Sequence, residues 1–394
     1  MQIEQRNNVI RLALGQALML SAIVMAMTIG AIIGATLAPS PGWATLPIAA
    51  MVVGTAIASL PAAILMRKLG RRSGFLIGTL LGIAGSLLCA WALHETSFIL
   101  FVAGHLLLGS YQGFANYYRF AAVEATGPEQ ASKAISLVVA GCVVAAFLGP
   151  QLGQWGREIV TGQTFIGSYL AQALLSVLAM VLLLGLCLPA VNIALGGQPR
   201  ALGQILRQPV LQVSILGAAV GYAAMIMIMT ATPLAMIGCG LPSSNVTPVI
   251  QWHVVGMFAP SFFTGNLIKR YGAPRIMQIG FALLLANVAV AISGLEFLHF
   301  LSALILLGVG WNFAFIGATT LLTLTYRPAE QLRVQAINEF TVFGLVALSS
   351  LSAGWLYANF GWLILNLSVV PLLIVALMVS RQMAKTGSAL PATS

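Results

Sequence analysis

The sequence predicts an all-α membrane protein in which twelve transmembrane helices form two related six-helix bundles. Its composition is the first reason, because 7% of the residues are charged and 59% are hydrophobic, whereas a soluble domain has about 25% charged residues. Apolar stretches of spanning length recur through the chain, and a basic hairpin occurs once in each half. These three observations favour a duplicated membrane bundle.

Twelve stretches reach the roughly 20 apolar residues that a helix needs to cross the hydrocarbon core of a bilayer. We expect a helix in each, because a helix satisfies its own backbone polar groups where water is absent. No soluble domain fits between them. The expected spans are 12–36, 44–66, 74–93, 98–122, 133–153, 166–190, 210–235, 246–268, 276–294, 298–324, 334–356 and 362–381.

The positive charge of the chain is placed as in a membrane protein. A net charge of +10 would suit a nucleic-acid partner, but all 18 Lys and Arg residues except Arg157 fall on or near one side of the predicted spans. Cytoplasmic loops carry such an excess of basic residues. The sequence therefore predicts a multi-pass protein of a bacterial-type inner membrane, with both termini cytoplasmic, lipid around it and no nucleic-acid partner.

A basic hairpin is repeated along the chain. Residues 63–72 and residues 265–275 both run from an apolar helix into a basic pair, x-Gly and further basic residues. Their glycines, Gly70 and Gly272, lie 272 − 70 = 202 positions apart in a chain of 394 residues. Internal repeats of this kind are typical of transporters that rock one half against the other. The expected domains are an N-terminal half (1–195), a cytoplasmic linker (196–208) and a C-terminal half (209–394).

On these features the chain resembles the major facilitator superfamily over its whole length. The first hairpin is similar to that family's loop motif Gly-x-x-x-Asp-Arg-x-Gly-Arg-Arg, but Ala63 replaces the first Gly and Arg67 stands at the Asp position. The resemblance implies that this loop and its repeat help to close the cytoplasmic side. The expected gate residues are Arg67, Lys68, Arg71, Arg72, Lys269 and Arg270.

A second motif lies at the end of the fifth predicted span. Residues 149–153 read Gly-Pro-Gln-Leu-Gly, which is similar to the Gly-Pro-x-x-Gly signature of proton-coupled drug antiporters in the same superfamily. The alternative is a Gly/Pro bend that lets two membrane helices pack closely.

One face of the fourth predicted span is polar. At 100° per residue, His105, Gly109, Gln112, Asn116 and Arg119 fall within about 80° of one another on an otherwise apolar helix. In the family that the chain resembles, the fourth helix lines the central cavity. We therefore expect His105, Gln112, Asn116 and Arg119 to contact a substrate. Packing against a polar neighbouring helix is the alternative.

The second half offers a weaker counterpart of this polar face. By the repeat, the tenth span should face the fourth, and it carries Asn312 and Thr319 with Trp311 beside them. Gln251 is a further polar candidate in the eighth span. The expected substrate-binding residues of the second half are Trp311, Asn312 and Gln251.

Glu339 is the expected proton-coupling residue. The chain has no aspartate, and of its 8 acidic residues only Glu339 lies inside a span. Ionisable residues within spans mark proton or substrate pathways. We also expect Glu339 to close the cytoplasmic side by pairing with Arg67 or Arg71, and His105 and His253 are further titratable candidates. An ion pair that only holds the two halves together is the alternative.

These features predict a secondary transporter that moves a small organic solute by alternating access, coupled to protons, with a leaning to efflux by antiport. The alternative is an uptake symporter for an anionic, zwitterionic or aromatic vitamin-like solute, which the basic and aromatic candidates favour. The H-E-x-x-H, G-x-S-x-G and P-loop motifs do not occur, so no enzyme, catalytic residue, metal or cofactor is expected. A channel remains open as a further alternative, and a monomer is expected.

Overall fold

A computed structural model describes residues 3–39, 43, 46–160, 164–188 and 200–385. Every secondary-structure element in these residues is a helix. The helices form two compact units, each made of segments that are not continuous in the sequence. Helix α15 (Gln331–Lys385) contributes residues to both.

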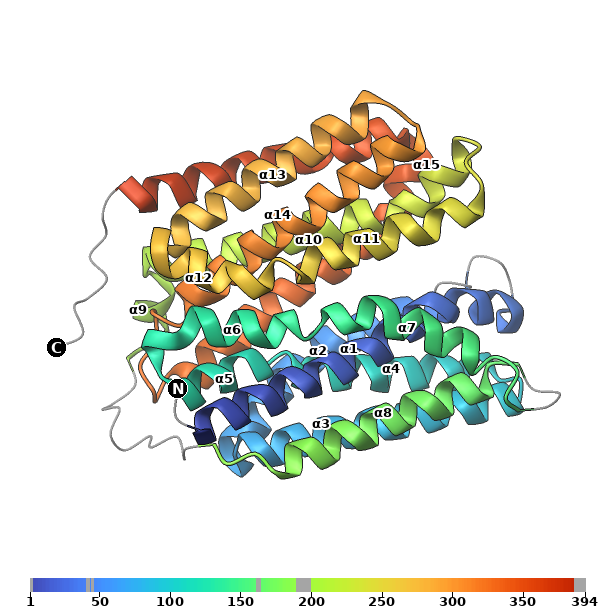
Figure 1. Ribbon diagram of the computed structural model, residues 1–394, viewed down its shortest axis with the longest axis horizontal. Helices are drawn as coiled ribbons and strands as arrows, with labels where there is room; N and C mark the ends of the chain where they lie inside the picture. Colours follow the sequence, from blue (N-terminus) through green and yellow to red (C-terminus); the bar gives the residue numbers. More distant parts are fainter. Residues whose placement is uncertain (1–2, 40–42, 44–45, 161–163, 189–199, 386–394) are drawn as a thin grey trace. The chain divides into compact units, whose positions relative to one another are not determined.

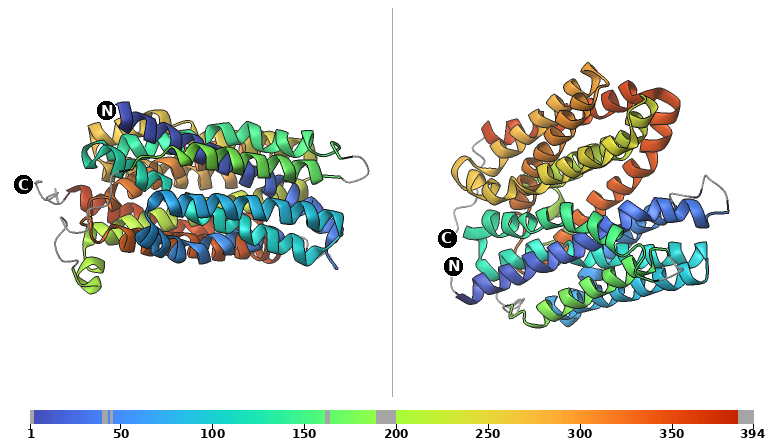
Figure 2. Two further views of the ribbon diagram at one scale, coloured as in Figure 1. Left: turned by 90° about the horizontal axis from the view of Figure 1, so that it is seen from below. Right: turned by 45° about the vertical axis from the view of Figure 1, so that its right-hand side comes forward.

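Unit 1 consists of Met1–Thr126, Gly141–Ala190 and Gln335–Ala347. Within it, α2 and α3 both pack against α4, and α3 also lies along α8 (Figures 1 and 2). Its other helices are α1, which packs against α7 and α8, and the short α5. The bounds are α1 Ile3–Leu37, α2 Leu46–Leu69, α3 Arg71–His94, α4 Phe98–Ala115, α5 Tyr118–Thr126, α7 Val143–Trp155 and α8 Ile166–Leu184.

Unit 2 consists of Gly127–Ala140, Val191–Val334 and Leu348–Ser394. Its centre is α14, against which α10, α11 and α13 pack, while α6 lies along α12 (Figure 1). The bounds are η2 Pro128–Gln130, α6 Ala131–Ala140, α9 Leu202–Leu206, α10 Pro209–Gly238, η4 Ser243–Asn245, α11 Val246–Phe258, α12 Ser261–Tyr271, α13 Ala273–Ser293 and α14 Phe297–Leu322.

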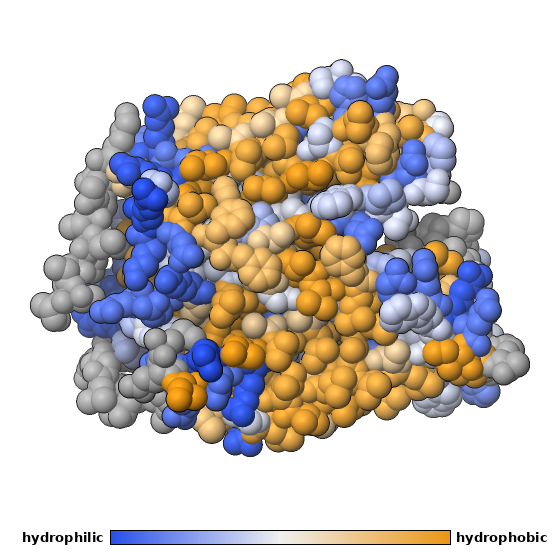
Figure 3. All heavy atoms as spheres, viewed as in Figure 1, coloured by the Kyte–Doolittle hydropathy of each residue, from blue (hydrophilic) through white to orange (hydrophobic). Residues whose placement is uncertain are grey.

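The described residues contain 10 helical stretches that are long and apolar enough to cross a membrane. The last of them, Gln331–Ala384, holds both the eleventh and the twelfth expected spans, which meet at the non-helical Gly361. The eighth expected span is the pair α11 and α12, which are too short to be counted separately. Hydrophobic side chains cover the flanks of the helices and hydrophilic side chains gather at their ends (Figure 3). The predicted fold class, an all-α membrane protein, is confirmed.

Three expected spans are interrupted instead of continuous. The breaks fall at Asn116–Tyr117 between α4 and α5, at Gly141–Cys142 between α6 and α7, and at Ala259–Pro260 between α11 and α12. Pro260 contributes to the last break because it has no backbone N–H to donate to the preceding turn. In membrane transporters, broken helices of this kind commonly form the substrate and ion sites.

Helices α2 and α4 approach each other most closely at two glycines. A Cβ atom on Gly109 would lie 1.8 Å from the Met51 carbonyl oxygen, and one on Gly54 would lie 2.3 Å from the Leu106 carbonyl oxygen. Thr55 uses this proximity to donate to the Gly109 carbonyl at 3.0 Å. Small residues are the usual means by which membrane helices pack this tightly.

The two basic hairpins share one backbone conformation. Gly70 precedes α3 with φ 84° and ψ 161°, and Gly272 precedes α13 with φ 85° and ψ 147°. This region suits glycine and strains residues with a Cβ. The match supports the sequence repeat. The division into halves 1–195 and 209–394 stays a prediction, and residues 196–199 of the expected linker lie outside the described residues.

We expect Gly70→Ala and Gly272→Ala each to lower the free energy of unfolding by about 1–2 kcal/mol, because both residues have positive φ. Gly203→Ala in α9 is the matched control. A Cβ at Gly203, as at Gly70, would meet nothing within 4 Å, but Gly203 has no positive φ. Thermal unfolding of the detergent-solubilised chain measures the difference. Equal stability of the Gly70 and Gly203 variants would contradict the backbone explanation.

Candidate functional site

A buried ion pair joins Arg119 of α5 to Glu339 of α15 within unit 1. Arg119 Nη2 donates to Glu339 Oε1 at 2.5 Å, and the two side chains are 7% and 0% exposed. Asn338 Nδ2 donates to the same oxygen at 2.8 Å. Glu339 Oε2 is buried and has no hydrogen-bond partner among the described residues. The carboxylate is therefore held through Oε1. Its Oε2 can still accept a proton or a hydrogen bond.

Glu339 has a different partner from the one that we expected. Arg67 is exposed, and Arg71 is committed elsewhere, because its guanidinium donates from Nε and Nη2 to the two carboxylate oxygens of Glu124. Arg71 Nη2 also donates to Gln335 Oε1 at 2.6 Å. A planar guanidinium suits such a two-point contact with a carboxylate. The expectation that Glu339 pairs with Arg67 or Arg71 is therefore wrong.

The remaining expected gate residues lie at the surface. Arg71 is buried at 5% exposure, and it is the one buried member of the group. The exposed members are Arg67, Lys68, Arg72, Lys269 and Arg270. Their role in closing the cytoplasmic side stays a prediction.

The polar face of α4 is partly taken up by helix packing. Gln112 Oε1 lies 3.3 Å from the Thr55 hydroxyl of α2. Asn116 is 6% exposed, and its Nδ2 has no hydrogen-bond partner among the described residues. Because the helix is interrupted at Asn116–Tyr117, the 100° spacing does not run unbroken to Arg119. Substrate contact by these residues stays a prediction.

His105 lies inside the packing of unit 1. It is 0% exposed, its Nδ1 is 2.9 Å from the Phe101 carbonyl oxygen, and its Nε2 is 3.4 Å from the Tyr169 hydroxyl. His253 is buried in the same way in unit 2, with Nδ1 2.8 Å from the Leu304 carbonyl oxygen. Both placements are those of packing residues, so a role for His105 in binding substrate rests on the sequence alone.

Asn312 of α14 bridges the break between α11 and α12. Its Nδ2 donates to the Met257 carbonyl and to the Ser261 hydroxyl, both at 2.6 Å. Its Oδ1 accepts from the Thr264 hydroxyl at 2.7 Å. One amide thus satisfies polar groups on both sides of the interruption at Pro260. This accounts for a buried asparagine in a membrane helix without a substrate contact.

Trp311, the neighbour of Asn312, belongs to an aromatic cluster of unit 2. Its ring stacks on Phe315 with centroids 4.9 Å apart and meets Tyr222 edge-on at 5.2 Å. Phe258, the last residue of α11, also meets Trp311 edge-on at 5.7 Å. Gln251 lies on the same face of α11, seven residues earlier, and is partly exposed. Tyr222, Phe258 and Phe315 were not among the residues expected from the sequence, and substrate contact by Trp311 and Gln251 stays a prediction.

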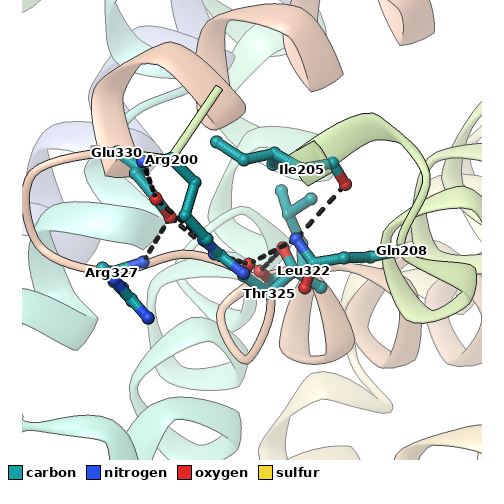
Figure 4. Close-up of polar contacts among 7 residues, drawn as sticks. All are labelled: Arg200, Ile205, Gln208, Leu322, Thr325, Arg327 and Glu330. Atoms are coloured by element: carbon teal, nitrogen blue, oxygen red, sulfur yellow. Dashed lines mark hydrogen bonds and ion pairs between the residues drawn. The ribbon is translucent and has the colours of Figure 1, made fainter. Parts of the chain in front are cut away.

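A second acidic site lies outside the candidate spans, where residue 200 meets the loop before α15 (Figure 4). Glu330 accepts from the Arg200 guanidinium at 2.6 and 2.8 Å and from the backbone N–H of Arg200 and Arg327. Arg200 Nη2 also donates to the Thr325 carbonyl at 2.9 Å. These hydrogen bonds, led by the guanidinium, lower the pKa of Glu330 to about 2 despite its burial. No pattern in the sequence indicates this pair, because both residues lie in loops.

Buried charges and broken helices within long apolar spans are features of membrane transporters. The family model of the Major Facilitator Superfamily matches residues 12–259. The chain belongs to this superfamily, and it is a multi-pass transporter and not an enzyme. The family predicted from the basic hairpin is therefore confirmed.

Relatives and solved structures agree with this assignment. The chain is 40% identical to the riboflavin transporter RfnT of Brucella anthropi over 375 residues. This match covers 94% of this chain and 94% of RfnT. It is 28% identical over 380 residues to the uncharacterized MFS-type transporter YddS of Bacillus subtilis, covering 90% of this chain and 86% of that one.

Two solved structures have the same fold. The transporter FucP in the outward conformation matches with a TM-score of 0.74 at 17% identity, covering 95% of this chain and 99% of FucP. The human organic anion transporter MFSD10 (TETRAN) matches with a TM-score of 0.74 at 13% identity, covering 96% and 100%. At these identities the likeness concerns the fold alone.

The Arg200–Glu330 pair predicts a pH dependence. Because the pKa of Glu330 is lowered from 4.5 to about 2, its contribution to stability is complete above about pH 4.5 and is lost as the pH falls toward 2. We expect Glu330→Gln to destabilise the chain by a constant amount from neutral pH to about pH 4.5, and to differ less and less from wild type as the pH falls from there toward 2. The measurement is acid-dependent thermal unfolding in detergent.

Glu129→Gln is the matched control for this experiment, since Glu129, in η2 before α6, is exposed. Its stability should follow wild type at every pH. A constant difference between Glu330→Gln and wild type from neutral pH to pH 2 would show that the carboxylate charge contributes nothing.

Proposed function

We propose that this chain takes up riboflavin, or a flavin of closely similar chemistry, across the bacterial plasma membrane. The observation that carries the proposal is the 40% identity to a riboflavin transporter over 94% of both chains. This supports the uptake of a vitamin-like aromatic solute, which was the alternative in the sequence-based prediction, better than it supports drug efflux.

The motif that favoured efflux has a packing explanation. A Cβ atom on Gly149 of α7 would lie 2.8 Å from Val24 Cβ and 3.1 Å from the Ser21 carbonyl oxygen of α1. A glycine is needed there for two helices to approach, whatever the direction of transport. Residues 149–153 therefore lend no separate weight to export.

We propose that Glu339 couples uptake to protons. Its carboxylate holds residues 335–347 to α5 through Arg119, while Gln335, one turn earlier, is held by Arg71 of α3. Protonation of Glu339 replaces the ion pair by a neutral acid beside a cation. Since hydrogen bonds between ionised groups are roughly twice as strong as neutral ones, this weakens one of the two attachments of the segment. Release and re-formation of that attachment is the step that we assign to the transport cycle.

The orientation follows from charge placement. We propose that both termini and the linker 196–208 are cytoplasmic, as the basic residues near span ends favour. We further propose that the chain acts as a monomer.

Expression of the chain in a bacterium that can neither make nor import riboflavin should restore growth at low external riboflavin. Uptake of labelled riboflavin should saturate, and unlabelled riboflavin loaded inside should accelerate entry, because a carrier returns faster when it is occupied. The same cells carrying an empty vector are the control. Linear, non-saturating uptake would favour a channel, and a fall in cellular riboflavin would favour export.

Glu339→Gln should abolish accumulation of riboflavin against its gradient, because glutamine keeps the size and hydrogen-bonding capacity of glutamate but does not titrate. Exchange of internal for external riboflavin should persist. The measurements are accumulation in vesicles with and without an imposed proton gradient. Glu95→Gln is the control, since the Glu95 side chain is 52% exposed. Proton-driven accumulation at the wild-type level in Glu339→Gln would refute the coupling role.

A further inference from the structure

We propose that Tyr222, Trp311, Phe315 and Thr319 of unit 2 form the subsite that holds the fused aromatic ring of the solute. This inference rests on the proposed function and deepens it, because it names the part of a flavin that the site recognises. The ring system of a flavin is flat, apolar on its faces and lined at its edge with carbonyl oxygens and ring nitrogens that accept hydrogen bonds.

The first support is the arrangement of the rings. Trp311 and Phe315 are nearly parallel, at 13° and 4.9 Å between centroids, and Tyr222 of α10 meets both of them edge-on at 5.2 and 5.5 Å. Edge-on and stacked contacts are the favoured geometries of aromatic rings. Tyr222 is the partly exposed member, whereas Trp311 and Phe315 are 3% and 4% exposed. A change in the Tyr222 rotamer, of the kind common on binding, opens the stack to a planar ligand.

The second support is a pair of buried polar atoms beside these rings. Trp311 Nε1 and Thr319 Oγ1 are buried and have no hydrogen-bond partner among the described residues. Such groups are usually paired, because an unpaired buried donor costs about 1–3 kcal/mol. Trp311, Phe315 and Thr319 follow one another at intervals of four residues, so they lie on one side of α14. An indole N–H and a hydroxyl in this row match the acceptors at the edge of a flavin ring.

Other buried residues of the same types in unit 2 have hydrogen-bond partners. The Nε1 of Trp362, also in unit 2, donates to the Ala291 carbonyl at 2.8 Å. The hydroxyl of Thr320, next to Thr319, donates to the Ile316 carbonyl at 2.8 Å. Unit 2 therefore satisfies a buried tryptophan and a buried threonine elsewhere, and leaves Trp311 Nε1 and Thr319 Oγ1 available.

The third support is the position of the subsite along the helices. Tyr222 and Trp311 both lie near the middle of long spanning helices, α10 and α14. Phe258 ends α11 at the break before Pro260, and it contacts Trp311. Substrate sites of membrane transporters lie near the bilayer midplane and at broken helices. The aromatic cluster meets both conditions within one unit.

The test measures flavin binding to the purified full chain in lipid nanodiscs, by quenching of flavin fluorescence. The probes are riboflavin and lumiflavin, which has the same ring with a methyl group in place of the ribityl chain. We expect Trp311→Phe and Thr319→Val to weaken binding of both probes, each by up to about tenfold, the range expected for the loss of one hydrogen bond. The two probes should lose affinity by the same factor, because the subsite contacts only the ring.

Trp362→Phe and Thr320→Val are the matched controls, and unfolding temperature is the second readout. Trp362→Phe loses an internal hydrogen bond, so it should unfold at a lower temperature and bind both probes normally. Trp311→Phe loses the same ring volume but no internal hydrogen bond from Nε1, so it should lose less stability than Trp362→Phe and should lose affinity for both probes. Lower stability with unchanged affinity in Trp311→Phe would make Trp311 a packing residue and would overturn the proposal.

Failure of this inference can be told apart from failure of the proposed function. If cells take up riboflavin while Trp311→Phe and Thr319→Val bind both probes like wild type, riboflavin uptake stands and the ring subsite is refuted. If cells do not take up riboflavin while lumiflavin binds in a Trp311-dependent way, the ring subsite stands and riboflavin uptake is refuted. Wild-type protein that binds neither probe would overturn the subsite.

Discussion

An ionised side chain inside a hydrocarbon layer is costly unless an opposite charge lies beside it, and the Arg119–Glu339 pair meets this constraint at the centre of unit 1. Both side chains are almost completely buried, so neither is stable there without the other. The pair also decides where residues 335–347 pack, because that segment of α15 is attached to α5 through Glu339. A second arginine, Arg71, attaches the same segment through Gln335. Charge neutralisation and helix placement are thus one requirement.

In unit 2 the buried polar groups at a helix break are satisfied by a neutral side chain and not by an ion pair. At the break between α11 and α12, Asn312 supplies the hydrogen bonds that the interrupted helices lack. The adjacent Trp311 lies within the continuous helix α14 and contacts Phe258, the last residue before the break. A carrier for a flat aromatic solute needs an apolar surface with a few hydrogen-bonding groups, and this corner of unit 2 provides both. We thus propose that unit 1 couples transport to protons and that unit 2 recognises the aromatic ring of the solute.

Much of the fold could be predicted from the sequence, because membrane insertion depends on properties that are local in the chain. Low charge and runs of about 20 apolar residues identify spans whatever they pack against. The repeated hairpin predicted two equivalent turns, and Gly70 and Gly272 have nearly the same backbone conformation. The breaks at Asn116–Tyr117 and Gly141–Cys142 were not predicted. No proline lies at either break, and the mean hydropathy of a whole span does not change when one helical turn is interrupted.

The sequence by itself determined that this chain is a helical membrane protein of transporter type, and it predicted two repeated halves and Glu339 as the acid inside a span. The tertiary structure decided which residues Glu339 and Arg71 bond. Arg119 and Glu339 are 220 positions apart, and no periodicity along one helix relates residues on two different helices. It also decided that His105 packs inside unit 1 and that Tyr222 joins Trp311. A helical wheel orders side chains around one axis, whereas their partners depend on how separate helices pack against one another.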